Sequence, residues 1–144
     1  MAKQRIEDII RDMGQYVSTS AGVSMFPMLR NRRDTVVIRP VTRELEKYDV
    51  PLYIREHDGA YVLHRIIGIR EDCYVIRGDN CVNKEYIKKS QIIGVLDEFY
   101  RGKLHVSCQS RGFKLYSGFA VAAHPAQMLA LRTFRVAKRI LKKK

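Results

Sequence analysis

Three short fragments of the sequence hold the residue types of a serine hydrolase. Ser24 stands in Ser-Met-Phe-Pro, His64 in Leu-His-Arg-Ile-Ile and Asp79 in Gly-Asp-Asn. A serine hydroxyl is a poor nucleophile at neutral pH, and it needs a base that a third group orients. His64 can be that base, because the ordinary imidazole pKa of about 6.5 leaves it mostly neutral at pH 7. The three residues together predict a hydrolytic serine site.

Each residue also has a plainer structural role, and that alternative stays open. His64 is expected on a strand face with Val62 and Ile66, where a histidine can simply belong to the core. Asp79 in Gly-Asp-Asn is also an ordinary turn residue.

The backbone around Ser24 is the candidate surface for a substrate carbonyl. Pro27 places Ser24 at a helix start or turn. Gly22 allows close approach of a ligand, and nearby backbone N–H groups could stabilise an oxyanion. We expect Gly22, Met25 and Pro27 to contribute to substrate or oxyanion binding.

The apolar patterning predicts a mainly β fold, with a small antiparallel β domain between two helices. Helical spacing of isoleucines predicts an amphipathic helix over residues 3–13, ended by Gly14. Runs of β-branched and aromatic residues predict the strands. These runs cover residues 35–39, 50–55, 61–70, 73–77, 92–100 and 104–107.

The C-terminal segment predicts an amphipathic helix over about 125–143, with Pro125 near its start. The expected apolar face holds Met128, Leu131, Phe134, Ala137 and Leu141, and the expected basic face holds Arg132, Arg135, Arg139, Lys142 and Lys143. The helix either docks on the sheet, or lies on an anionic membrane surface through residues 127–144.

Size and charge limit the remaining choices. A chain of 144 residues fits one domain over 1–144, with a core over about 18–110. The net charge of +12 favours acidic partners, namely nucleic acid, anionic lipid or acidic peptide. Three cysteines without C-x-x-C spacing argue against a disulfide framework or zinc site, and no metal or cofactor is expected. Neither a signal peptide nor a membrane-spanning stretch is evident, so we expect a cytoplasmic protein, free or peripheral on the inner face of the membrane.

The segment Gly22–Leu29 resembles the nucleophile box of signal peptidase I and the LexA-type peptidases, which share Ser-Met-x-Pro. The segments 34–38, 49–53 and 91–94 resemble strands of that superfamily, and the resemblance covers about residues 18–100. It implies a signal peptidase/LexA-like β fold and a serine endopeptidase. Overall, the chain most resembles a small soluble group of bacterial peptidases in this superfamily.

His64 stands where the bacterial signal peptidases carry a lysine and the archaeal and endoplasmic-reticulum enzymes carry a histidine. The resemblance therefore implies Ser24 as nucleophile and His64 as general base. It offers Asp79 and Glu85 as acidic residues that orient the imidazole, and we expect Asp79 first, because Glu85 replaces the family's aspartate.

The expected activity is cleavage of an extended signal, leader or pro-peptide that adds to a strand edge. Two alternatives remain. Met28, Arg33 and Glu85 depart from the family pattern, which is compatible with an inactive peptide- or membrane-surface-binding module. The charge suits a nucleic-acid binder, but the sequence holds no recognisable nucleic-acid-binding motif.

Overall fold

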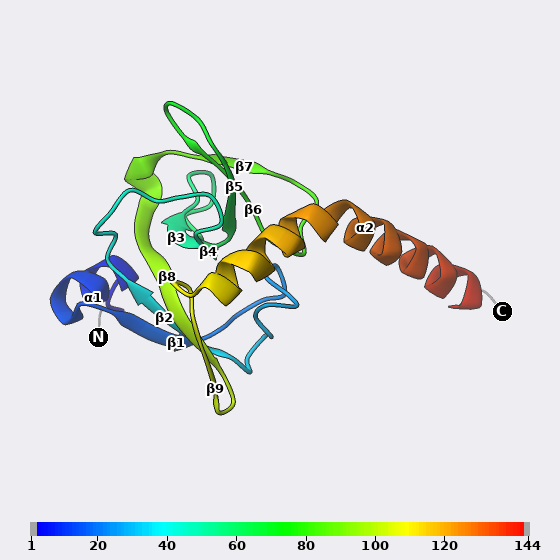
Figure 1. Ribbon diagram of the computed structural model, residues 1–144, viewed down its shortest axis with the longest axis horizontal. Coiled ribbons are helices and arrows are strands. Elements are labelled where there is room, and N and C mark those ends of the chain that lie inside the picture. Colours follow the sequence, from blue (N-terminus) through cyan, green and yellow to red (C-terminus); the bar gives the residue numbers. More distant parts are fainter. Residues whose placement is uncertain (1–2, 143–144) are drawn as a thin grey trace.

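Two antiparallel sheets form the body of the protein in the computed structural model, which describes residues 3–142 (Figure 1). The larger sheet has the order β1-β2-β8-β3-β4, with β9 also paired to β8, and the smaller has the order β5-β6-β7. The larger sheet contains β1 (Tyr16–Thr19), β2 (Thr35–Arg39), β3 (Pro51–Ile54), β4 (Tyr61–Leu63), β8 (Ile92–Arg101) and β9 (Leu104–Ser107). The smaller contains β5 (Arg65–Ile69), β6 (Tyr74–Arg77) and β7 (Glu85–Ile87). The mainly β fold class is confirmed.

The larger sheet separates two hydrophobic clusters, because successive side chains of a strand point to opposite faces. Leu52 and Leu96 join one cluster, which also holds residues of the N-terminal helix and of the Ser24 segment. Tyr53 and Val95, their neighbours in β3 and β8, join the other cluster with the smaller sheet. The long strand β8 therefore carries the packing of both halves.

The predicted strand over residues 61–70 is divided by the structure. Its first part is β4 in the larger sheet and its second part is β5 in the smaller sheet. His64 lies at the crossing between them, so the expected strand face shared with Val62 and Ile66 is wrong. The apolar run is continuous because both sheets bury it, and periodicity alone does not reveal the crossing.

The two helices differ in how well the sequence predicted them. Helix α1 (Ile6–Met13) ends at Gly14, whose φ of 74° and N–H bond to the Ile10 carbonyl form a left-handed cap. Helix α2 (Arg111–Lys142) begins fourteen residues before Pro125, which lies inside it. The expected start at Pro125 is wrong, because Ser110 Oγ caps the helix at the Phe113 N–H. Lys143 lies outside the described residues.

A buried guanidinium connects five separate parts of the chain. Arg65, fully buried at the start of β5, pairs with Asp79 through Nε and Nη2, both at 2.8 Å. Its Nη1 donates to the Tyr48 carbonyl and to Ser117 Oγ of α2, and its Nη2 lies 3.0 Å from Met28 Sδ. Strand β5, the turn between β6 and β7, the Tyr48 segment, the Ser24 segment and α2 thus share one charged residue.

Tyr48 holds a conformation that favours glycine. Its φ is 81°, in the left-handed region that residues other than glycine seldom adopt. Its carbonyl accepts from Arg65 and its N–H donates to the Ile66 carbonyl at 2.8 Å. These bonds hold a backbone shape that costs of the order of 1 kcal/mol or more for a non-glycine residue.

No helix in residues 3–142 combines the length and the apolar character that crossing a membrane requires.

Replacing Arg65 with methionine should destabilise the fold strongly. The change leaves the Asp79 carboxylate buried without its partner, which costs about 3–5 kcal/mol when a buried pair is broken. Urea unfolding followed by circular dichroism measures the difference. Arg39→Met is the matched control, because Arg39 pairs with Asp97 at the surface and should contribute below about 1 kcal/mol. A loss for Arg65→Met no larger than for the control would contradict the central role of this pair.

Candidate active site

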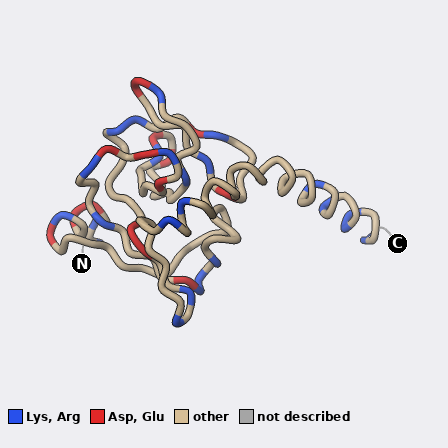
Figure 2. Tube along the Cα trace, viewed as in Figure 1, with Lys and Arg blue, Asp and Glu red and all other residues tan. Residues whose placement is uncertain are grey.

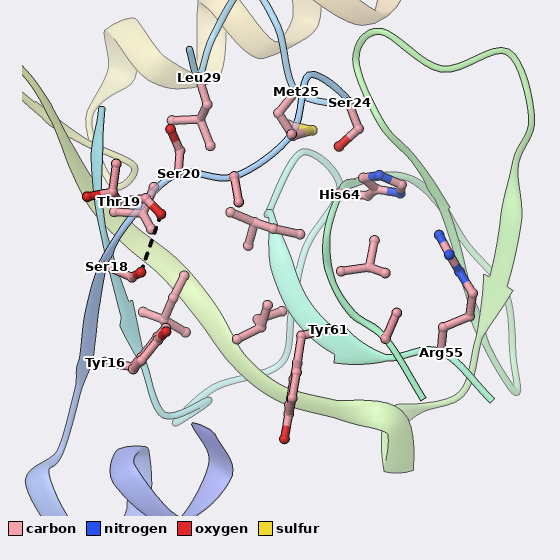
Figure 3. Close-up of a pocket in the computed structure, with 18 of the residues that line it drawn as sticks. Tyr16, Ser18, Thr19, Ser20, Ser24, Met25, Leu29, Arg55, Tyr61 and His64 are labelled. Carbon is pink, nitrogen blue, oxygen red and sulfur yellow. Dashed lines mark hydrogen bonds between the residues drawn. The ribbon is translucent and has the colours of Figure 1, made fainter. Parts of the chain in front are cut away.

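A groove of about 480 Å³ opens between the two end strands of the larger sheet, β1 and β4. Figure 3 shows Tyr16, Ser18 and Thr19 on one side of it and Tyr61 on the other. The sheet curls until its two edges line one groove, and each end strand has one side unpaired. The groove floor is apolar, with Met25, Leu29, Val36, Ile38, Leu52 and Leu63.

The loop between β1 and β2 carries Ser24 to one end of this groove. Asp34, fully buried at the end of the loop, accepts from Arg30 Nε and Nη2 at 3.0 and 2.8 Å. Arg101 of β8 donates to the carbonyls of Pro27 and Met28 at 2.7 and 2.8 Å. These side chains therefore fix the backbone that follows Ser24.

A tight turn after β6 lies against Ser24 from the other side. The Asn80 N–H donates to the Ser24 carbonyl at 2.8 Å, and the Asn80 side chain donates to the Val23 carbonyl at 3.1 Å. A Cβ on Gly78 would lie 2.7 Å from the Ser24 carbonyl oxygen and 3.0 Å from His64 Nε2. Only glycine lets the turn pass between the backbone of Ser24 and the imidazole.

His64 is 6% exposed and faces the groove with Ser24. Figure 3 shows the Ser24 hydroxyl and the His64 ring pointing toward one another at one end of the groove. No hydrogen bond joins the two side chains within residues 3–142. Catalytic hydrogen bonds are often loose before substrate is bound, so this spacing is compatible with a base and its nucleophile.

The hydrogen bonds of Tyr53 determine which imidazole nitrogen is free. Tyr53 Oη lies 3.2 Å from His64 Nδ1, and it donates its single proton to the Glu85 carboxylate. Because that proton is used, the bond with His64 requires an Nδ1–H that donates to Tyr53 Oη. The lone pair then lies on Nε2, the nitrogen nearer Gly78 and the Ser24 backbone. This is the tautomer that a general base needs.

Charge and burial keep His64 neutral. Burial lowers the pKa of His64, the positive charge of Arg55 lowers it further, and the negative charges of Glu85 and Asp79 oppose these effects. Arg55 Nη2 pairs with Glu85 at 2.9 Å, which holds the carboxylate beside Tyr53. Burial and the bond to Glu85 raise the pKa of Tyr53, so the phenol stays protonated.

The two candidate acids, Asp79 and Glu85, differ in their hydrogen-bond partners. Both oxygens of Asp79 are taken by the Arg65 guanidinium at 2.8 Å, and Asp79 makes no hydrogen bond to His64. Glu85 reaches the imidazole through Tyr53. Of the two carboxylates, Glu85 and not Asp79, which was expected first, is therefore the one linked to His64 by hydrogen bonds.

Of the three residues expected to bind substrate, two line the groove and one does not. Met25 lines the groove, and the N–H groups of Ser24 and Met25 donate to no acceptor within the described residues. Gly22 lines the groove with a φ of 82°, but its N–H already donates to Asn31 at 2.8 Å. Pro27 does not line this groove and lines a different pocket, so its contribution to substrate binding stays a prediction.

Sequence reasoning missed Tyr53, Arg55 and Arg65. Tyr53 and Arg55 lie two residues apart around β3, and they meet Glu85 only because the smaller sheet folds over the larger one. Arg65 could have been found from the sequence, because a charged residue inside the apolar run Leu-His-Arg-Ile-Ile requires a buried partner.

Residues 3–142 hold no group of three or more histidine, cysteine, aspartate or glutamate side chains placed to bind a metal ion. No family model matches the chain, and no curated protein matches its sequence.

The protonation of His64 can be followed by NMR of its ring C–H signals. We expect its pKa below about 6.5, and Glu85→Gln should lower it further, because the replacement removes a negative charge that favours imidazolium. Glu98→Gln is the control, since Glu98 lies beside His105 at the far hairpin. A His64 pKa above 7, or one that Glu85→Gln raises, would contradict this electrostatic description.

Proposed function

We propose that the protein is a serine endopeptidase, similar in its site to the histidine type of signal peptidase, in which Ser24 is the nucleophile and His64 the general base. The observation that carries the proposal is the pair of side chains facing one another at the end of a groove between two unpaired strand edges (Figure 3). The free Nε2 of the His64 tautomer supports the assignment of the base.

The proposed reaction follows from these positions. Ser24 Oγ attacks the scissile carbonyl while His64 Nε2 takes its proton, and the resulting oxyanion accepts from the N–H groups of Ser24 or Met25. His64 then gives the proton to the leaving amine, and water hydrolyses the acyl-enzyme by the reverse route. Tyr53 and Glu85 act as positioning residues, because their hydrogen bonds hold the ring and the carboxylate charge stabilises the imidazolium.

The groove indicates the substrate class. An extended peptide can lie between β1 and β4 and use their unpaired backbone groups, as peptides do when they extend a sheet. The apolar floor suits small or apolar side chains on the residues before the cut. Signal, leader and pro-peptides all fit this description.

The proposal places the enzyme in a reducing compartment, as expected for the cytoplasm. All three cysteines are unpaired, and Cys81 lies in the groove wall close to the Ser24 carbonyl. A thiol at that position would be open to oxidants outside such a compartment.

An inactive peptide-binding module is the second candidate, and the missing hydrogen bond between Ser24 and His64 favours it. The same groove would hold the peptide without cleaving it. The reactivity of the Ser24 hydroxyl distinguishes the peptidase from the inactive module, because a serine-directed reagent modifies an activated serine and not an ordinary one.

A fluorophosphonate probe should label the protein at Ser24, as read by mass spectrometry of the digested adduct. Ser24→Ala should remove the label, and His64→Ala should slow labelling by about 10²-fold or more, the usual contribution of a general base. Ser18→Ala is the matched control, because Ser18 lines the same groove without facing His64. Equal labelling of Ser24→Ala and wild type would refute the nucleophile.

The labelling rate should also depend on pH in a set direction. Only neutral His64 can accept the proton, and its pKa is lowered by burial. The rate is therefore expected to be constant from pH 7 to 8 and to fall on acidification below about pH 6.5. A rate that still rises between pH 7 and 8 would assign the base to another group.

A further inference from the structure

The second half of α2 leaves the body of the protein. Figure 1 shows it projecting well beyond both sheets. Its first half is anchored by three buried residues, Phe113, Ser117 and His124. Residues 132–142 are exposed throughout. The expected docking of this helix on the sheet therefore holds only for the first half.

One side of α2 presents large apolar side chains to water. At 3.6 residues per turn, these side chains share a broad face that is continuous with the exposed Leu115 and Phe119 of the first half. Their exposed fractions lie between 53% and 76%, for Leu115, Phe119, Leu129, Phe134, Val136, Ile140 and Leu141. Met128 and Leu131, expected on this face, instead line a pocket against Asn80 and Val82. The exposed apolar face is thus wider than a coiled-coil seam and turned away from the body.

The opposite side of the projecting half is uniformly basic. It holds Arg132, Arg135, Lys138, Arg139 and Lys142, and no aspartate or glutamate occurs after Glu98. Figure 2 shows Lys and Arg along this part of the helix and no acidic residue. A helix with one broad apolar face and one cationic face has the composition of an interfacial membrane helix.

We infer that the exposed face of α2 binds the surface of an anionic lipid bilayer, with its apolar side chains among the acyl chains and its cations at the headgroups. Charge complementarity selects this partner. A second copy of the chain would cover the apolar side and leave the cations of the opposite side without an anionic partner. A nucleic acid would neutralise the basic side and leave the apolar side in water. Only an anionic lipid interface both removes the apolar side from water and pairs the cations with anions.

The same geometry sets the orientation of the bound protein. The buried residues Phe113, Ser117 and His124 fall on the same side of the helix as the cations, opposite the exposed apolar face. A helix lying in the interface therefore keeps the body and its groove on the water side. This inference goes beyond the proposed peptidase activity and does not depend on it.

Tryptophan fluorescence tests the inference directly, because the chain has no tryptophan. In Ile140→Trp the indole lies on the apolar face, and in the matched control Lys138→Trp it lies on the opposite face. With vesicles of phosphatidylglycerol and phosphatidylcholine, we expect a blue shift and quenching by brominated acyl chains for Ile140→Trp, and neither for Lys138→Trp. Equal quenching of the two, or none in either, would overturn the inference.

Two further measurements cover the other partners. The double variant Arg135→Gln/Arg139→Gln should bind anionic vesicles at least about tenfold more weakly in cosedimentation, since each interfacial cation contributes roughly 1 kcal/mol. In a separate mobility-shift assay, the wild-type protein should not bind random RNA at 150 mM salt. Binding to phosphatidylcholine alone as strong as to the anionic vesicles would overturn the role of charge. A dimer in sedimentation velocity without lipid, accompanied by a blue shift of Ile140→Trp, would assign the face to a second copy instead.

Discussion

The buried guanidinium of Arg65 is the interaction on which the arrangement of this protein depends. Removing a charge from water costs several kcal/mol, so such a group is retained only where every donor finds an acceptor. Asp79, Ser117 and the Tyr48 carbonyl provide those acceptors from three distant segments. Because hydrogen bonds are directional, they fix position as well as proximity, which apolar packing alone does less strictly. The Ser24 segment is located against the rest through the same residue, by way of Met28.

The two carboxylates near the imidazole illustrate how neighbours assign roles. Asp79 and Glu85 occur within seven residues of one another and both lie near His64. A bidentate pair with arginine directs both oxygens of Asp79 to the guanidinium, and Asp79 makes no hydrogen bond to the ring. One oxygen of Glu85 pairs with Arg55 and the other accepts from Tyr53. The Tyr53 phenol thus connects Glu85 to the imidazole by hydrogen bonds. The positions of the hydrogen-bond donors, rather than the carboxylates themselves, determine which acid is linked to the His64 imidazole.

The sequence was most informative where structure is local. Five of the six predicted strand regions were located to within a few residues, because β-branched runs ended by turn residues are a short-range signal. The short polar strands β1 and β7 were missed, since their pairing comes from neighbours and not from their own composition. The crossing at His64 and the division between Asp79 and Glu85 were also missed. Both depend on contacts between the two sheets, which no spacing in the chain encodes.

Helix α2 is anchored at the turn that supports the Ser24 backbone. His124 Nε2 bonds to the Cys81 carbonyl at 2.6 Å, and Gln127 reaches Asn80 at 3.5 Å. The same turn holds the Ser24 carbonyl. Two hydrogen bonds in series, from Gln127 to Asn80 and from Asn80 to the Ser24 carbonyl, therefore join the helix to the backbone at the end of the groove.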